Sequence, residues 1–284
     1  MPRHDGRSAN YSTGDMKRID LPEIEDQPWC PGWLRWVLTA YLKEAIRASG
    51  AYDASAPSLS ELIASSSTPK IVDLCSGGGG PWPELLDRID LRFDQTATVT
   101  LTDLYPEPGN RPGTDDDRVS FHPAPVAADA VPADLSGIRT MFTALHHFNP
   151  PEVERILGAA QRDGVGFAAF EATHRSLKGL LVTLLIPLLV LLLIPRVRPV
   201  RWFSLVLTYL IPIVPIAVWW DGFASTLRTY REREIREMIE RLPVSGYTWA
   251  VAEVRTGKGP LPMLQIIGRP NRRENSSVLP RAAE

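Results

Sequence analysis

Residues 70–81 read Lys70-Ile71-Val72-Asp73-Leu74-Cys75-Ser76-Gly77-Gly78-Gly79-Gly80-Pro81. The stretch passes from a short β-branched run to an acid and then into consecutive glycines. Because glycine has no Cβ, the backbone of such a turn can adopt positive φ angles and lie close to a ligand. The stretch therefore predicts a buried strand that ends in a ligand-binding turn.

A second apolar run, residues 98–103, ends at Asp103. The order strand, acid, glycine-rich turn, helix, strand, acid is typical of an α/β sheet that holds an adenosine-containing cofactor at the carboxyl ends of its strands. The carboxylate of Asp103 can accept hydrogen bonds from both ribose hydroxyls. We therefore predict an α/β protein with a nucleoside cofactor.

The spacing of the glycines helps to identify the cofactor. A dinucleotide fingerprint requires G-x-G-x-x-G after the strand, and here the third glycine would fall at Trp82. Starting the pattern two residues earlier places Cys75 at the first glycine. Asp73, before the turn, is foreign to the dinucleotide pattern and suits a ligand with a cationic amino group. S-adenosylmethionine carries such an ammonium group, a ribose diol and a sulfonium.

At residues 71–79 the sequence resembles the class I S-adenosylmethionine-dependent methyltransferases, whose first motif is roughly hh-D-x-G-x-G-x-G. The resemblance extends over residues 70–171 and 225–268. It implies a Rossmann-like seven-stranded α/β sheet. It also implies S-adenosyl-L-methionine as the cofactor. The implied cofactor-binding residues are Asp73, Cys75, Gly77, Gly79, Asp103 and, from the region after the third strand where the family often contacts adenine, Asp129.

Apolar periodicity and turn residues predict the other elements. Helices are predicted over residues 28–48, 60–63, 83–89, 151–160 and 226–242, and strands over residues 119–121, 140–150 (running out into a loop), 165–170, 247–254 and 263–267. We expect disordered tails at 1–27 and 269–284, a helical cover at 28–69, and a methyltransferase domain at 70–268. Trp29, Trp33 and Trp36 of the cover either line the substrate pocket or belong to the core.

Composition excludes several classes of function. The formal net charge is −2, and Lys and Arg form no stripe with interleaved aromatics, so we expect no nucleic-acid partner. Two distant cysteines without CxxC spacing indicate a reducing compartment and no zinc site. Residues 1–20 are polar, and we expect no signal peptide.

A hydrophobic hairpin, residues 177–220, interrupts the methyltransferase domain. Residues 179–194 and 202–220 are apolar runs, and Arg196, Arg198 and Arg201 separate them. Each run is near the lower limit of the about 17–25 residues that span a bilayer. Both ends rejoin one domain, so two spans would place the arginines on the far side, against the positive-inside rule.

Three arrangements of this hairpin remain open: a shallow or re-entrant hairpin in one leaflet, two true spans, or an apolar lid or dimer interface. We expect association with a membrane through residues 179–220, with the catalytic domain in the cytoplasm. Because the insertion follows the fifth strand at the reacting end of the sheet, we also expect a lipophilic small-molecule or lipid acceptor. Deletion of residues 179–220 is expected to leave a soluble, cofactor-binding protein.

Methyl transfer from a sulfonium is an in-line displacement, and positioning of the two reactants can supply up to about 7–11 kcal/mol. A base is needed only when the acceptor must lose a proton. His146, His147 and Glu171 follow strand ends where a catalytic base would act, and histidine titrates near neutral pH. Alternatively, one histidine packs under the cofactor and the other caps a backbone group. These three residues lack metal-ligand spacing on a helix, and no metal site is predicted.

Asp221 and Arg228 lie in a polar cluster directly after the apolar runs. They either flank the acceptor, or Asp221 starts a helix and Arg228 forms a surface ion pair. The sequence as a whole predicts a membrane-associated S-adenosylmethionine-dependent methyltransferase. The alternatives are an NAD(P)-dependent oxidoreductase on a similar sheet and a non-catalytic S-adenosylmethionine-binding membrane protein.

Overall fold

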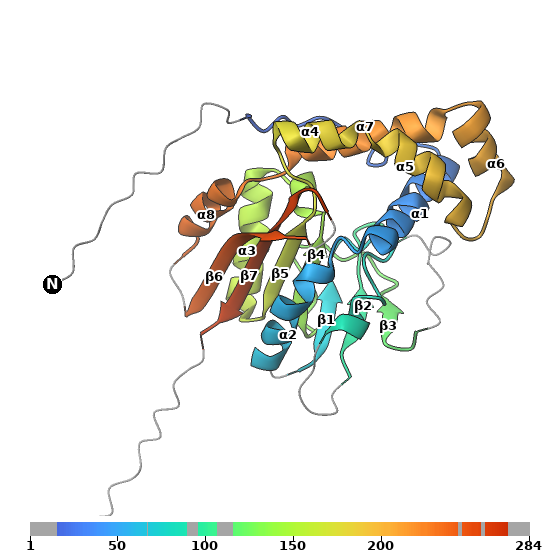
Figure 1. The fold of residues 1–284 in the computed structure, drawn as a ribbon. Coiled ribbons are helices and arrows are strands. Elements are labelled where there is room, and N and C mark those ends of the chain that lie inside the picture. Colours follow the sequence, from blue (N-terminus) through green and yellow to red (C-terminus); the bar gives the residue numbers. More distant parts are fainter. Residues whose placement is uncertain are drawn as a thin grey trace, which may run out of the picture.

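The computed structural model describes residues 16–66, 68–89, 96–106, 116–243, 246–256 and 259–271. At its centre lies a seven-stranded sheet with the order β3-β2-β1-β4-β5-β7-β6 (Figure 1). The strands are β1 (Lys70–Asp73), β2 (Thr98–Leu101), β3 (Val119–Phe121), β4 (Ile138–Phe142), β5 (Phe167–Glu171), β6 (Tyr247–Arg255) and β7 (Pro262–Pro270). The first five are parallel, and β7 runs antiparallel to both of its neighbours. The predicted Rossmann-like seven-stranded α/β sheet is confirmed.

Helices cover both faces of this sheet. One face packs against α2 (Ala56–Ser65) and the short 3₁₀ turns η1 (Asp53–Ser55) and η2 (Leu86–Arg88). The other packs against α3 (Pro150–Asp163) and α8 (Glu232–Glu240). Every residue of β5 is buried, as expected for a central parallel strand covered on both sides.

A third hydrophobic core lies at the carboxyl end of the sheet, between the N-terminal helix and the insertion. It joins α1 (Gly32–Ser49) to α5 (Ile186–Leu193) and α7 (Ile213–Arg228), with Val37, Val190 and Val214 fully buried. The insertion also contains α4 (Leu177–Thr183), α6 (Trp202–Leu205), the 3₁₀ turn η4 (Ile194–Arg196) and the π-helical turn η5 (Val206–Leu210). With α5 and α7 these elements form a layer across the top of the sheet, and α1 descends beneath it (Figure 1). We call α4 to α7 the inserted layer.

Local sequence explains where α3 begins and ends. Asn149 Oδ1 accepts a hydrogen bond from the Glu152 amide (3.1 Å), and Glu152 Oε2 accepts one from the Asn149 amide (2.8 Å). This capping box, with prolines in the first turn, fixes the start of the helix. Gly164, at φ 63°, ends it in the left-handed conformation. The 3₁₀ turn η3 (Leu145–His147) precedes α3 and carries both histidines of the candidate site.

Three predicted helices differ in the structure. Residues 83–89 form turns and the short 3₁₀ turn η2 in place of a regular helix. The helix predicted over 226–242 is two helices, since the backbone of Thr229 leaves the helical conformation (φ −54°, ψ 132°). Helix α2 begins four residues before Ser60, which is an interior position.

The described part of the N-terminal tail is packed against the body. Arg18 donates to the carbonyls of Arg228 (2.7 Å) and His146 (3.0 Å), and Glu23 is buried. Residues 16–27, part of the stretch expected to be disordered, therefore lie over the sheet edge in defined contacts. The rest of that tail, residues 1–15, and residues 272–284 of the C-terminal tail lie outside the described residues.

Candidate functional site

The glycine turn follows β1 directly and needs its glycines for two different reasons. Gly77 has a φ of 46°, in the left-handed region that disfavours side chains. Gly78 has an ordinary φ, but a Cβ there would stand 2.4 Å from Cγ2 of Thr39 in α1. Helix α1 therefore rests directly on the turn. Cys75, at the position of the family's first glycine, also has a positive φ of 54°, and burial raises the pKa of its thiol.

Asp73 ends β1 and lies beneath this turn, with 1% of its surface exposed. Ser76 Oγ donates to Oδ2 (2.8 Å) and Thr140 Oγ1 donates to Oδ1 (2.5 Å). Burial raises the pKa of Asp73 to about 7, although these hydrogen bonds act in the opposite direction. Each carboxylate oxygen has a second lone pair, so Asp73 keeps capacity to accept a bond from an amino group.

Asp103 follows β2 and stands beside the glycine turn. Its Oδ2 accepts a hydrogen bond from the Gly77 amide (3.0 Å), and its Oδ1 accepts one from the Tyr105 amide (2.9 Å). The structure thus brings Asp73, Asp103 and the glycines to one edge of the sheet. Asp129, in the loop after β3, forms an ion pair with Arg155 of α3 (3.0 Å). Its contact with adenine stays a prediction.

The structure also brings together the three residues proposed for catalysis. Glu171, at the end of β5, accepts a hydrogen bond from the Leu145 amide (2.8 Å) and lies 2.7 Å from His146 Nδ1. His146 is 1% exposed, and its Nε2 faces Glu23 at 3.4 Å. Burial disfavours the charged imidazole, but the two carboxylates outweigh this effect and raise the pKa of His146 to about 9.

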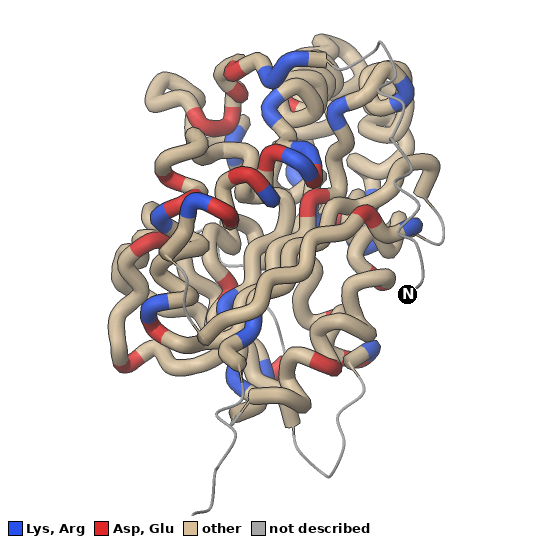
Figure 2. The backbone as a smooth tube through the Cα atoms, turned by 90° about the vertical axis from the view of Figure 1, so that its left-hand side faces the viewer, with Lys and Arg blue, Asp and Glu red and all other residues tan. Residues whose placement is uncertain are grey.

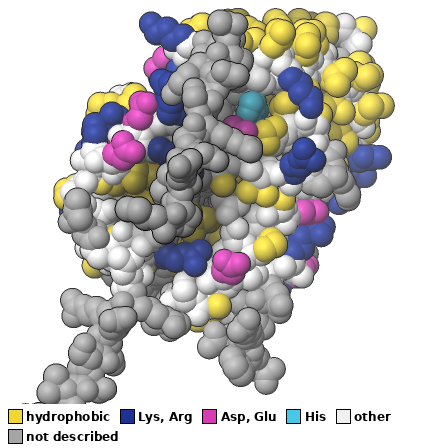
Figure 3. All heavy atoms as spheres, turned by 60° about the vertical axis from the view of Figure 1, so that its left-hand side comes forward, with side chains coloured by type: hydrophobic (Ala, Val, Ile, Leu, Met, Phe, Trp, Pro, Cys, Tyr) yellow, Lys and Arg dark blue, Asp and Glu magenta, His cyan; other side chains and the backbone are white. Residues whose placement is uncertain are grey.

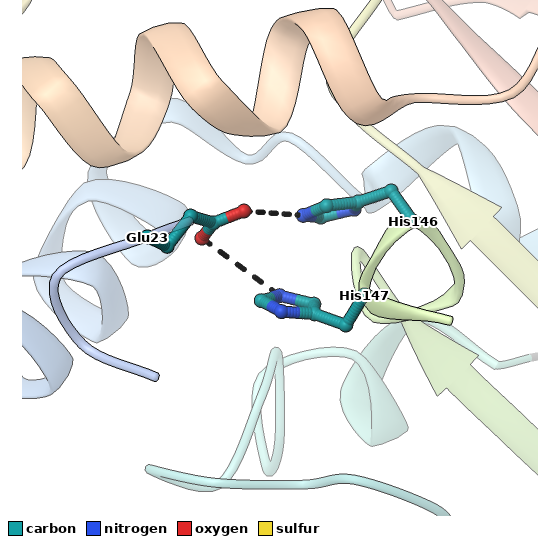
Figure 4. Close-up of side chains that lie close together, drawn as sticks. All are labelled: Glu23, His146 and His147. Carbon is teal, nitrogen blue, oxygen red and sulfur yellow. Dashed lines mark ion pairs between the residues drawn. The ribbon is translucent and has the colours of Figure 1, made fainter. Parts of the chain in front are cut away.

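His147 is the more accessible histidine, with 30% of its side chain exposed. Its Nδ1 lies 2.8 Å from Asp26 Oδ2, and its Nε2 lies 3.9 Å from Glu23 Oε2. The two imidazole rings lie side by side, with centroids 4.3 Å apart, and both point toward Glu23 (Figure 4). The side chains of Glu23, His146 and His147 therefore form one cluster, held from outside by Glu171 and Asp26.

Sequence reasoning missed Glu23 and Asp26, because it assigned both to a disordered tail. A usable signal was the apolar Ile24 among four acids in residues 20–26. The reason for the burial lies far along the chain. Asp221 Oδ1 accepts a hydrogen bond from the Ile24 amide (2.5 Å), and Arg228 Nη1 lies 3.4 Å from Glu23.

Two sequence interpretations are corrected here. Asp221 lies inside α7 and holds the N-terminal segment, so it does not start a helix. Arg228 is buried, so its ion pairs are not surface pairs. Of the three tryptophans, Trp29 is 67% exposed, and Trp33 and Trp36 pack edge-on against Phe203 of the inserted layer.

A small cavity borders the glycine turn at Gly80. Its volume is about 60 Å³, and its lining includes Lys43 and Arg47 of α1 together with Tyr52. Ligand pockets usually enclose about 300–1,000 Å³, so this cavity by itself is too small for a nucleoside cofactor.

Charges of both signs are interspersed on the side of the molecule turned to the viewer in Figure 2. No one-signed field extends over that side. The absence of a nucleic-acid partner stays a prediction from the formal net charge of −2.

No protein-family model and no curated protein matches the sequence. Among solved structures, the plantazolicin methyltransferase BpumL in complex with SAH aligns with a TM-score of 0.53 at 9% identity, over 88% of this chain and 93% of that chain. Two others have TM-scores below 0.5 and carry no weight. They are a putative Zn-dependent alcohol dehydrogenase from Rhodobacter sphaeroides (0.48, 12% identity, 84% of this chain and 98% of that chain) and the CurJ carbon methyltransferase (0.47, 10% identity, 81% and 57%). Strand order, the antiparallel β7 and the match to BpumL give one conclusion: the chain has the class I S-adenosylmethionine-dependent methyltransferase fold.

Proposed function

We propose that this protein is an S-adenosylmethionine-dependent methyltransferase that associates with a membrane and methylates a lipophilic small molecule or lipid. One observation carries the proposal. The glycine turn after β1 and the carboxylate of Asp103 after β2 meet at the carboxyl edge of the sheet, joined by the bond between the Gly77 amide and Oδ2. Open α/β sheets bind nucleoside cofactors at this edge.

In this proposal Asp103 accepts hydrogen bonds from the ribose hydroxyls, and Gly77 and Gly79 let the backbone approach the cofactor. Asp73 takes the amino group of the methionine moiety, since its carboxylate has unused lone pairs below the turn. Cys75 shapes the turn through its positive φ. The neighbour BpumL was solved with SAH, which is the product of the same cofactor.

The inserted layer supports the membrane part of the proposal. Residues Leu177–Arg196 form a stretch of 20 residues with a mean hydropathy of 2.7, long and apolar enough to cross a membrane, and only 28% of it is buried. Large apolar side chains point outward along this stretch and along the second apolar run: Leu177, Leu181, Leu184, Leu185, Leu188, Leu189, Leu191, Leu192, Trp202, Leu210, Ile211 and Ile216 are exposed. They gather at the top of the molecule (Figure 3). An exposed apolar surface of this kind marks an interaction site.

The packing of the layer favours an arrangement along the bilayer surface over a span. Helices α5 and α7 pack their inner sides against α1, and α7 runs across the top of the sheet (Figure 1). The second apolar run is bent by 79° between Trp202–Leu210 and Ile213–Arg228. A helix with one buried and one apolar exposed side can lie in the lipid interface. The exposed Arg196 and Arg198, at the end of the layer, would reach lipid phosphates from this position.

The catalytic domain then lies against the cytoplasmic face of the membrane, where a reducing compartment suits the free thiols of Cys30 and Cys75. A lipophilic acceptor enters from the bilayer, since the inserted layer lies over the same sheet edge as the cofactor site. Positioning of acceptor and methyl group supplies most of the rate, up to about 7–11 kcal/mol.

A base is required only for an acceptor that must lose a proton. His146 is 1% exposed and its two ring nitrogens face the carboxylates of Glu171 and Glu23, so it is poorly placed to take a proton from an acceptor. His147 is more accessible and is the better candidate of the two. In this arrangement Glu171 is a positioning residue, because it holds His146 and the Leu145 amide of η3.

The test is transfer of labelled methyl groups by the purified full-length protein. With methyl-labelled S-adenosylmethionine well below saturation and a cell lipid extract, we expect label in the organic phase and strongly reduced label with an Asp103→Ala control. A protein that binds the cofactor but labels no fraction of the extract would be a non-catalytic binder. A protein that instead retains NAD(P) would be an oxidoreductase.

A further inference from the structure

We propose that Glu23, His146 and His147 form a binding site for one first-row divalent transition-metal ion, of which Zn²⁺ is the natural probe. The three side chains offer two imidazole Nε2 atoms and one carboxylate, and these ligand atoms all lie within 4.8 Å of one another. Imidazole and carboxylate are ordinary ligands of such ions. The set crosses the chain from the N-terminal segment to η3 (Figure 4).

The distances fit a shared metal ion better than direct ion pairs. Charge-assisted N–H···O bonds are about 2.7–2.9 Å long, but His146 Nε2 lies 3.4 Å and His147 Nε2 lies 3.9 Å from Glu23. Bonds of about 2.0–2.1 Å in a tetrahedral zinc site place neighbouring ligand atoms about 3.3 Å apart. A small rotation of the His147 side chain would complete that arrangement.

An unpartnered buried atom is the second, independent observation. His146 is 1% exposed, yet its Nε2 has no hydrogen-bond partner among the described residues and points at Glu23. A buried polar atom without a partner is costly. A metal ion between this nitrogen and the carboxylate would satisfy both.

Both histidines are also held as metal-bound histidines usually are. The ring nitrogen that faces away from the cluster bonds a carboxylate in each case: His146 Nδ1 to Glu171 (2.7 Å) and His147 Nδ1 to Asp26 (2.8 Å). Such outer carboxylates fix the tautomer and ring orientation of the ligand and make it more basic. The tautomer with a proton on Nδ1 leaves each Nε2 free to bind the metal.

The charged groups around the cluster carry two more negative than positive charges. The carboxylates of Glu23, Asp26 and Glu171 lie within 4 Å of the imidazole nitrogens, and among the described residues one guanidinium group, that of Arg228, is paired with these carboxylates. A divalent ion neutralises the remainder, as would two imidazolium protons. Arg228 lies 3.4 Å from Glu23 but also contacts Asp20 and Asp26, so it keeps partners when Glu23 turns to a metal. The ion would then fasten the N-terminal segment over the sheet edge.

The experiment is titration of chelator-treated full-length protein with Zn²⁺ by calorimetry, and with Co²⁺ by its visible absorption. We expect one ion per chain, with Glu23→Gln and His147→Asn each weakening binding by at least about tenfold, since even outer-shell losses cost about 10–100-fold. Glu25→Gln is the matched control. It lies in the same segment, but its carboxylate bonds Thr39 of α1, and we expect unchanged affinity.

Two results would overturn the proposal: wild-type protein that takes up neither ion, or Glu23→Gln protein that binds as tightly as wild type. Circular dichroism shows whether each variant is folded. If Glu23→Gln is unfolded, His147→Asn decides the question. Binding of S-adenosylhomocysteine, measured separately, keeps this outcome apart from the proposed methyltransferase function.

Discussion

Replacing Asp103 with alanine removes the carboxylate that stands beside the glycine turn at the end of β2. In the proposed complex this carboxylate accepts two ribose hydroxyls, and each hydrogen bond to a charged acceptor contributes about 1.5–3 kcal/mol. Asp103 is half-buried, so the lower figure applies to each bond. The expected loss is about 3 kcal/mol, or about 100-fold in the Kd for S-adenosylhomocysteine.

Isothermal titration calorimetry measures this change directly. Asp103→Asn keeps one acceptor oxygen, so its affinity for S-adenosylhomocysteine should fall by only about tenfold. Because this oxygen can still accept the hydrogen bond from the Gly77 amide, the variant reports the loss of ligand contacts apart from the loss of that bond. Asp134→Ala removes an exposed carboxylate of equal charge and should leave the Kd unchanged. An unchanged Kd in Asp103→Ala, with the variant folded, would remove Asp103 from the cofactor site.

Three further predictions follow from packing, burial and exposure. Gly78→Ala should lower the free energy of unfolding, measured by chemical denaturation, by about 1–3 kcal/mol, because the new Cβ clashes with Cγ2 of Thr39. Thr39→Ser removes this Cγ2 but keeps the hydroxyl, so it should restore most of the lost stability. An equal loss from Gly78→Ala in the wild-type and Thr39→Ser backgrounds would contradict the contact. Burial raises the pKa of Asp73 to about 7 in the folded protein, so the free energy of unfolding should fall by up to about 4 kcal/mol as the pH rises from about 4 to 7. Asp73→Asn should make the stability less dependent on pH in this range. An equally steep dependence in the variant would show that other groups cause it. Replacing the exposed Leu184 and Leu188 with glutamine should reduce co-flotation of the protein with anionic lipid vesicles, while the Kd for S-adenosylhomocysteine stays the same. Undiminished flotation would show that α4 and α5 do not contact the membrane.

The strands were predictable because each parallel strand is a short apolar run between turn residues. Residues 119–121 and 70–73 match β3 and β1 closely, and the β-branched run before Asp73 reflects burial on both faces. The glycine turn and Asp103 were predictable for the same local reason, since motif and spacing lie within one strand-turn-strand unit.

The parts that could not be predicted depend on contacts between distant segments. Periodicity continues through Thr229, so the pattern alone joins α7 to α8, whereas the backbone of this residue leaves the helical conformation (φ −54°, ψ 132°). The burial of Glu23 depends on Arg228, about two hundred residues away along the chain. No local pattern reports such a pair.

The insertion is the clearest case of this limit. Its apolar runs suggested a separable hairpin, but Val190 and Val214 pack into a core with Val37 of α1. Deletion of residues 179–220 would expose the inner side of α1, and we now expect an unstable protein rather than a soluble one. The sequence showed that the segment is apolar, and the structure shows that one side of it packs against α1.

The most direct test of the central claim is a competition binding measurement on the full-length protein with S-adenosylhomocysteine and NAD⁺. Two carboxylates, Asp73 and Asp103, across a turn without side chains predict one site per chain that takes S-adenosylhomocysteine and is not displaced by NAD⁺. A protein that binds NAD⁺ at this site, or binds neither compound, would contradict the account.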